Sequence, residues 1–149
     1  MALLQQGDKA PAFKGINQHG EPVKLTDYKG KKLVLYFYPK DSTPGCTAEA
    51  CDLRDNYQQF IANGYEILGV SPDSAKSHVK FIEKYELPFS LLADEDHSIA
   101  ESFGAWGEKS MYGKKYMGIL RSTFVIDEKG KIEKVIEKVN TKAHTQQLL

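Results

Sequence analysis

Two cysteines, Cys46 and Cys51, are the thiols of this 149-residue chain, and both lie in the stretch 39–51. Thr43 is a good helix N-cap, and Pro44 suits the first helical position, where its missing N–H costs nothing. Cys46 then occupies the third helical position, among unpartnered backbone N–H groups at the positive end of the helix dipole. These surroundings favour a thiolate over a thiol, so the stretch predicts a reactive sulfur at Cys46.

The spacing of the two cysteines limits what they can do together. Residues five apart on an α-helix have Cα atoms about 8.6 Å apart, whereas a disulfide needs Cα atoms within roughly 7 Å. Cys46 and Cys51 therefore cannot bond while the helix between them is intact, but unwinding one or two turns would bring them together. The alternative is that both are small core residues. For Cys51, which shares a face with apolar neighbours, a core role and a redox role are equally good interpretations. For Cys46 the core role is disfavoured, because a helix N-terminus behind a Ser-Thr-Pro-Gly loop is a poor place for burial.

Other cysteine chemistries fit the pattern less well. A dithiol oxidoreductase of thioredoxin type has C-x-x-C, whereas this chain has C-x-x-x-x-C. A structural zinc site needs four ligands, and the histidines show no ligand pairing, so we expect no metal. A Cys-His hydrolase needs a base that the sequence does not place beside the sulfur. We expect each histidine to be an ordinary surface or helix residue: His19, His78, His97 and His144.

Arg121 is the second candidate for the site. It begins the strongly apolar segment 121–127, and a permanently charged guanidinium at a strand end could stabilise a thiolate and orient an oxygen ligand. A surface ion pair is the alternative. The hydroxyl of Thr43 can both donate and accept hydrogen bonds, so a capping role and a catalytic role are compatible.

The elements that must position these residues follow from the apolar periodicity. Strands are predicted at 32–38, 66–71 and 90–93, helices at 44–62, 74–86 and 98–103, and hairpins at 13–25 and 122–139, with the start of a helix at the end of the chain. The segment 107–118 shows no period and is predicted to be a loop. Alternating strands and helices imply an α/β fold with a largely parallel central sheet, to which the closing hairpin adds antiparallel strands. We expect a single domain over 1–149.

The charge pattern bears on which classes of partner the chain could bind. The chain has 20 Lys+Arg and 20 Asp+Glu, a formal net charge of zero, and no long block of one sign. It gives no support for binding to nucleic acid or to an anionic membrane surface. Residues 1–13 lack the pattern of a secretory signal, and the apolar run 33–38 is too short to cross a bilayer. We expect a soluble, cytoplasmic protein.

A family resemblance rests on the same residues. The pattern Pro39-x-x-x-Thr43-x-x-Cys46 resembles the active-site motif of the peroxiredoxins. TPGCT followed by a second cysteine five residues on resembles their bacterioferritin-comigratory protein, or Q-type, branch. The resemblance extends over nearly the whole chain, including segments 7–13, 33–39, 69–73 and 121–127.

This resemblance implies a thioredoxin-like fold, with a central mixed β-sheet flanked by helices and an N-terminal hairpin extension. It implies that Cys46 is the peroxidatic cysteine and Cys51 the resolving one, joined during turnover by an intramolecular disulfide. Thr43 and Arg121 match the active-site threonine and arginine of the family. Pro39 matches the motif proline that shields the substrate pocket, where Gly45 is also expected.

The implied activity is reduction of hydrogen peroxide and alkyl hydroperoxides in antioxidant defence, without a cofactor and with thioredoxin as reductant. The chain lacks the V-C-P-T motif and the cysteine-bearing tail of the oligomeric members, so a monomer is expected. A redox sensor that oxidises once per molecule is the alternative. The predicted loop 107–118, with Met111, Tyr112 and Met117 in it and Trp106 just before it, either borders the pocket or is an ordinary surface loop.

Overall fold

The computed structural model describes residues 3–149, so the predicted domain of residues 1–149 extends two residues beyond this range. The elements along the chain are β1 (Lys14–Ile16), β2 (Pro22–Lys24), the 3-10 helix η1 (Leu25–Tyr28), β3 (Lys32–Phe37), α1 (Pro44–Asp55), α2 (Tyr57–Ala62), β4 (Tyr65–Ser71), α3 (Ala75–Tyr85), β5 (Ser90–Ala93), α4 (Ser98–Ser102), β6 (Trp106–Met111), β7 (Lys114–Ile119), β8 (Ser122–Ile126), β9 (Ile132–Ile136) and α5 (His144–Leu148). Among residues 3–149, no helix is long and apolar enough to cross a membrane.

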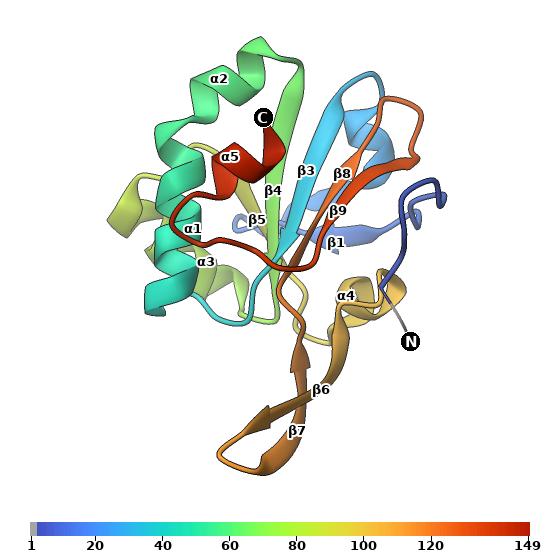
Figure 1. Cartoon of the computed structure of the whole chain (residues 1–149). Helices are drawn as coiled ribbons and strands as arrows, with labels where there is room; N and C mark the ends of the chain where they lie inside the picture. The colour runs from blue at the N-terminus through green and yellow to red at the C-terminus, as the bar shows by residue number, and fades with distance from the viewer. Residues whose placement is uncertain (1–2) are drawn as a thin grey trace.

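The central sheet has five strands in the order β5-β4-β3-β8-β9 (Figure 1). β3, β4 and β5 run parallel, whereas β8 is antiparallel to β3 and β9 is antiparallel to β8. β1 and β2 form the separate N-terminal hairpin. The predicted mixed sheet with flanking helices and an N-terminal hairpin is therefore confirmed.

Side chains of β3 alternate between two apolar cores. Leu33, Leu35 and Phe37 face the core that includes α4 and the N-terminal hairpin. Val34 and Tyr36 face the other core, which the helices α1, α2, α3 and α5 cover. This alternation is the period of two that an extended strand imposes, and burial on both faces explains the uninterrupted apolar run. Figure 1 shows α1 beside the sheet and α5 returning across it at the end of the chain.

Two predicted elements were wrong. The single helix predicted over 44–62 is broken at Asn56, whose backbone leaves the helical region at φ −113° and ψ 11°. The Asn56 side chain donates to the carbonyl of Asp52 at 2.8 Å, a local bond that competes with helix continuation. The apolar period runs through the break because Leu53 and Phe60 face the same core.

The segment 107–118 is a hairpin of β6 and β7 and not the predicted loop. Tyr112 and Gly113 both have positive φ, 52° and 79°, which is the requirement of a tight two-residue hairpin turn. The strands carry no apolar alternation because most of their side chains are exposed or half-exposed. Periodicity depends on one face being buried, so sequence patterning could not detect this hairpin.

Candidate active site

A buried carboxylate fixes the loop that leads from β3 into α1. Asp41 accepts hydrogen bonds from the hydroxyls of Tyr38 at 2.6 Å and Ser77 at 2.8 Å. Nδ1 of His78 lies 2.7 Å from the same carboxylate. The next residue, Ser42, adopts the left-handed region at φ 63°, which turns the chain into the helix. Asp41 therefore holds the entry to α1 against α3.

Cys46 lies on the buried face of α1. It is the third residue of the helix, its side chain is 1% exposed, and it packs in the same core as Ala50 and Leu53. The expectation that Cys46 would not be buried was therefore wrong. Residues 46, 50 and 53 recur at the spacing of one helix face, and that face packs on the sheet. The sulfur is thus both at a helix N-terminus and shielded from bulk water.

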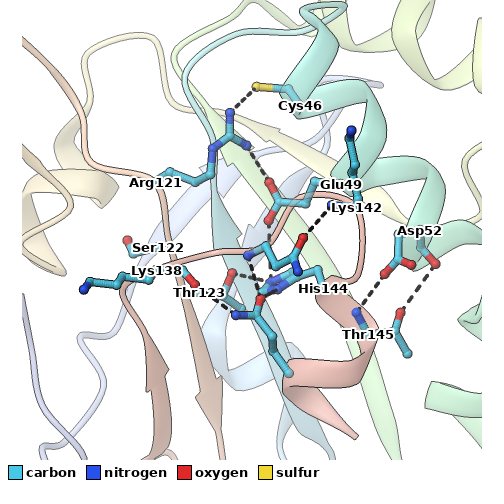
Figure 2. A network of polar contacts seen from close by, with 12 residues as sticks. Cys46, Glu49, Asp52, Arg121, Ser122, Thr123, Lys138, Lys142, His144 and Thr145 are labelled. Carbon is cyan, nitrogen blue, oxygen red and sulfur yellow. Dashed lines mark hydrogen bonds and ion pairs between the residues drawn. The ribbon is translucent and has the colours of Figure 1, made fainter.

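Arg121 joins this sulfur to a buried carboxylate (Figure 2). Its Nη2 donates to Cys46 Sγ at 3.2 Å, and its Nη1 donates to Glu49 Oε1 at 2.6 Å. Burial alone lowers the pKa of Arg121, but Cys46 and Glu49 beside it raise that pKa above its ordinary value. The guanidinium therefore stays charged and forms its ion pair with a fully buried partner instead of a surface carboxylate.

Glu49 was missed by the sequence analysis. Its side chain is 0% exposed, and burial raises its pKa from 4.5 to about 7 against the lowering effect of Arg121. Glu49 follows Cys46 by three residues, so both lie on the same face of α1. A glutamate on an otherwise apolar helix face was the available signal, since a buried carboxylate requires a partner.

His144 lies beneath Glu49, at the start of α5. Its Nε2 is 3.5 Å from Glu49 Oε2 and 2.8 Å from the Thr123 hydroxyl, and its Nδ1 is 2.7 Å from Gln147 Oε1. Burial lowers the pKa of His144, against the raising effect of Gln147. The expectation that the histidines are ordinary surface or helix residues was wrong for His78 and His144, which are both 0% exposed and face carboxylates. Side-chain burial of this kind depends on tertiary contacts.

Thr43 occupies the predicted N-cap position, with extended backbone angles. Its hydroxyl donates to the carbonyl of Lys40 at 2.8 Å and so closes the loop instead of capping the helix. Gly45 follows close to the guanidinium, because a β-carbon there would lie 3.4 Å from Arg121 Nη2. Pro39 is half-buried where the chain leaves β3. The loop backbone therefore passes beside the Cys46 sulfur and its arginine.

Cys51 is half-buried on the same intact helix, and both thiols are free. The geometry agrees with the spacing argument: the folded helix holds the two sulfurs out of disulfide reach. Among residues 3–149, no group of three or more His, Cys, Asp or Glu side chains is placed to hold a metal ion.

Comparison with known proteins decides the family. The model of the AhpC/TSA family matches residues 6–135. The chain belongs to the AhpC/TSA family. It is 53% identical to Peroxiredoxin Bcp of Bacillus subtilis over 146 residues, which are 98% of this chain and 93% of that one. It is 49% identical to Peroxiredoxin Bcp of Escherichia coli over 144 residues, which are 97% and 92% of the two chains.

Solved structures agree with these relatives. The bacterioferritin comigratory protein of Xanthomonas campestris superposes with a TM-score of 0.89 at 37% identity, covering 97% of this chain and 94% of the other. Peroxidoxin BcpB of Mycobacterium tuberculosis gives a TM-score of 0.86 at 34% identity, covering 97% and 93%. The thioredoxin-like fold and the peroxiredoxin family are thus confirmed. As a peroxiredoxin, the protein is a thioredoxin-dependent thiol peroxidase.

Lys109, in the β6–β7 hairpin of this peroxiredoxin, responds to the charges of the site. Burial lowers the pKa of Lys109, and the charges of Arg121 and Cys46 act on it in opposite directions. Beyond Lys109 the hairpin presents exposed side chains, with Met111 56% and Tyr112 99% exposed. The tip of the hairpin therefore projects into solvent (Figure 1).

Proposed function

We propose that Cys46 is the peroxidatic cysteine and that Cys51 resolves it within the same chain. The single observation that carries the first part is the 3.2 Å hydrogen bond from Arg121 Nη2 to Cys46 Sγ, at the N-terminus of α1. An arginine and a helix N-terminus together stabilise a thiolate, which is the nucleophilic form of cysteine.

In the first step, the Cys46 thiolate attacks the terminal oxygen of the peroxide. A sulfur–oxygen bond forms, the O–O bond breaks, and the leaving alkoxide or hydroxide takes up a proton. Arg121 and the backbone N–H of Cys46 donate to the peroxide oxygens and stabilise the charge that develops on them. The Thr43 hydroxyl, whose own hydrogen goes to the Lys40 carbonyl, accepts from the peroxide O–H. Pro39 and Gly45 line this pocket. The sulfur is oxidised to a sulfenic acid, a reversible state.

In the second step, the first turns of α1 unwind and the Cys51 thiol attacks the Cys46 sulfenic acid. A disulfide forms and water leaves. Unwinding is required because the intact helix keeps the sulfurs apart, and Gly45 weakens the turns that must open. A dithiol protein of thioredoxin type then reduces the disulfide by exchange through a mixed disulfide.

The substrates proposed are hydrogen peroxide and alkyl hydroperoxides, in antioxidant defence. Alkyl peroxide reduction is the activity described for the X. campestris relative. An intramolecular disulfide needs no second chain, so we also propose a monomer. We place it in the cytoplasm because two free thiols suit a reducing compartment. The five-stranded sheet that spans β3 to β9 supports one domain over 1–149.

A pair of single variants tests the assignment. Cys46→Ser should abolish peroxide consumption, and substantial residual turnover would refute the role of Cys46. Cys51→Ser is the matched variant: it should form one equivalent of sulfenic acid but not be recycled efficiently by thioredoxin. Mass spectrometry of the parent protein after one equivalent of peroxide should show a Cys46–Cys51 linkage, and its absence would refute the intramolecular scheme. Oxidation that stops after one event, with thioredoxin and its reductase present, would identify a sensor.

A further inference from the structure

His144 contacts a carboxylate that already orients the catalytic arginine. Glu49 binds Arg121 through Oε1 only. Among residues 3–149, no donor is within hydrogen-bonding geometry of its other oxygen, Oε2, although this atom is fully buried. The group that faces Oε2 is Nε2 of His144, at 3.5 Å. A buried, unpaired carboxylate oxygen is costly, so a nearby ring that can carry a proton bears directly on the charge of Glu49.

The hydrogen-bond partners of His144 determine which of its ring nitrogens can gain or lose a proton. The Gln147 side-chain oxygen only accepts, so Nδ1 of His144 carries a hydrogen towards it. Nε2 faces the Thr123 hydroxyl, which can donate or accept, and Glu49 Oε2. When Nε2 is unprotonated, it accepts from Thr123 and Glu49 Oε2 lacks a donor. When Nε2 is protonated, its N–H serves the oxygens of both Thr123 and Glu49.

The cluster therefore holds a proton whose position is divided between Glu49 and His144. The other charged or titratable groups that act on this pair are Asp52 on α1, Arg121 before β8 and Tyr36 on β3. Arg121 connects the pair to the sulfur, as Figure 2 shows along the line from His144 to Cys46. An ionised Glu49 holds the arginine more firmly than a protonated one, because charge-assisted hydrogen bonds are the stronger kind.

We propose that His144 is a positioning residue for peroxide reduction: it orients Glu49 and shares its proton, and Glu49 in turn holds the Arg121 fork against Cys46. The C-terminal helix α5 thereby becomes part of the peroxidase site without touching the peroxide. The proposal rests on Cys46 being the attacking thiol.

The test replaces His144 by phenylalanine, which fills the ring volume but offers no proton to Glu49. Without a ring nitrogen to share it, the proton should remain on the Glu49 carboxyl to higher pH. The pH midpoint of Cys46 oxidation should rise by about one unit, and the rate near neutral pH should fall roughly tenfold, since one unit is a factor of ten. His144→Gln, whose amide nitrogen can reach the place of Nε2, should restore most of the rate. An unchanged midpoint in His144→Phe would overturn the proposal.

A matched control separates positioning from simple loosening of α5. Leu148, which is 4% exposed, anchors the same helix in the apolar core and has no hydrogen-bond donor to offer Glu49, so Leu148→Ala should lower stability and leave the pH midpoint in place. If Leu148→Ala moves the midpoint as far as His144→Phe does, undocking of α5 explains the effect and the proposal fails.

Infrared spectroscopy gives a readout that does not need activity. The carbonyl stretch of a protonated buried carboxyl should titrate in the wild type, vanish in Glu49→Gln and persist to higher pH in His144→Phe. A band that titrates identically in the wild type and in His144→Phe would overturn the proposal for His144, whatever the activity of Cys46→Ser. Peroxide turnover by Cys46→Ser would instead refute the role of Cys46, and the infrared titration would still report on His144.

Discussion

Replacing Arg121 by methionine isolates what the guanidinium contributes to the sulfur. Methionine keeps much of the length of the side chain but has no N–H donor. The variant loses the 3.2 Å bond to Cys46 Sγ and the 2.6 Å bond to Glu49 Oε1 together. The arginine side chain is only 24% exposed, so water cannot fully replace either bond. We therefore expect a large effect on the first chemical step.

The magnitude follows from the bond that is lost. A hydrogen bond to a charged group contributes about 1.5–3 kcal/mol, which corresponds to roughly ten- to hundredfold in rate. We expect peroxide attack to slow within that range. Stability should fall too, because removing one partner of a buried ion pair costs about 3–5 kcal/mol. Since Arg121 lowers the pKa of Glu49, its removal moves that pKa above about 7, and the loss of stability should be greatest at higher pH.

The assay is single-turnover oxidation of Cys46 by hydrogen peroxide in a Cys51→Ser background. In this background Cys46 is the only thiol, so the measured rate is that of its oxidation. Arg54→Met is the matched control, because Arg54 lies near the end of the same helix and binds Asp55 and the carbonyl of Tyr85. That control should oxidise at the parental rate. Equal rates for Arg121→Met and Arg54→Met would refute the reasoning, since the bond to Cys46 would then contribute nothing to attack.

Three further outcomes follow from the same structure. Folded Glu49 keeps its proton up to about pH 7 while the unfolded chain loses it near 4.5, so its contribution to the free energy of unfolding falls as pH rises between these values. Urea unfolding of Glu49→Gln should show a flatter profile across this window, and a profile parallel to wild type would contradict the assignment. Cys51→Ser under excess peroxide should accumulate sulfinic acid on Cys46 faster than wild type, as measured by intact mass, because no thiol intercepts the sulfenic acid. Asp41→Asn removes a charged acceptor from buried hydroxyls and should lower the free energy of unfolding by about 2 kcal/mol; an unchanged urea midpoint would show that the loop is held by other contacts.

Much of the fold was predictable because it follows from local rules. The strand β3 is buried on both faces, and the alternation of strands and helices implied the parallel part of the sheet. The break at Asn56 and the β6–β7 hairpin were missed for a physical reason. The first depends on one side-chain bond within a continuous apolar pattern, and the second is exposed on both faces and has no pattern to detect.

The sequence by itself determined that Cys46 lies at a helix N-terminus and how far it is from the second cysteine. Both follow from backbone geometry over a few residues: a helix begins after Thr43, and five residues on a helix separate Cys46 and Cys51 beyond disulfide reach. The sequence also made Arg121 a candidate, which the family resemblance favoured over a surface ion pair. Only the tertiary structure shows that its guanidinium contacts Cys46 and Glu49.

Only the tertiary structure decided which charges meet at the sulfur. Arg121 reaches Cys46 across 75 residues because β8 lies antiparallel beside β3. His144 reaches Glu49 because α5 returns to α1 at the end of the chain. Each of these contacts joins segments that no local periodicity relates, and the burial that shifts the pKa of Glu49 exists only once the helices have closed over the sheet.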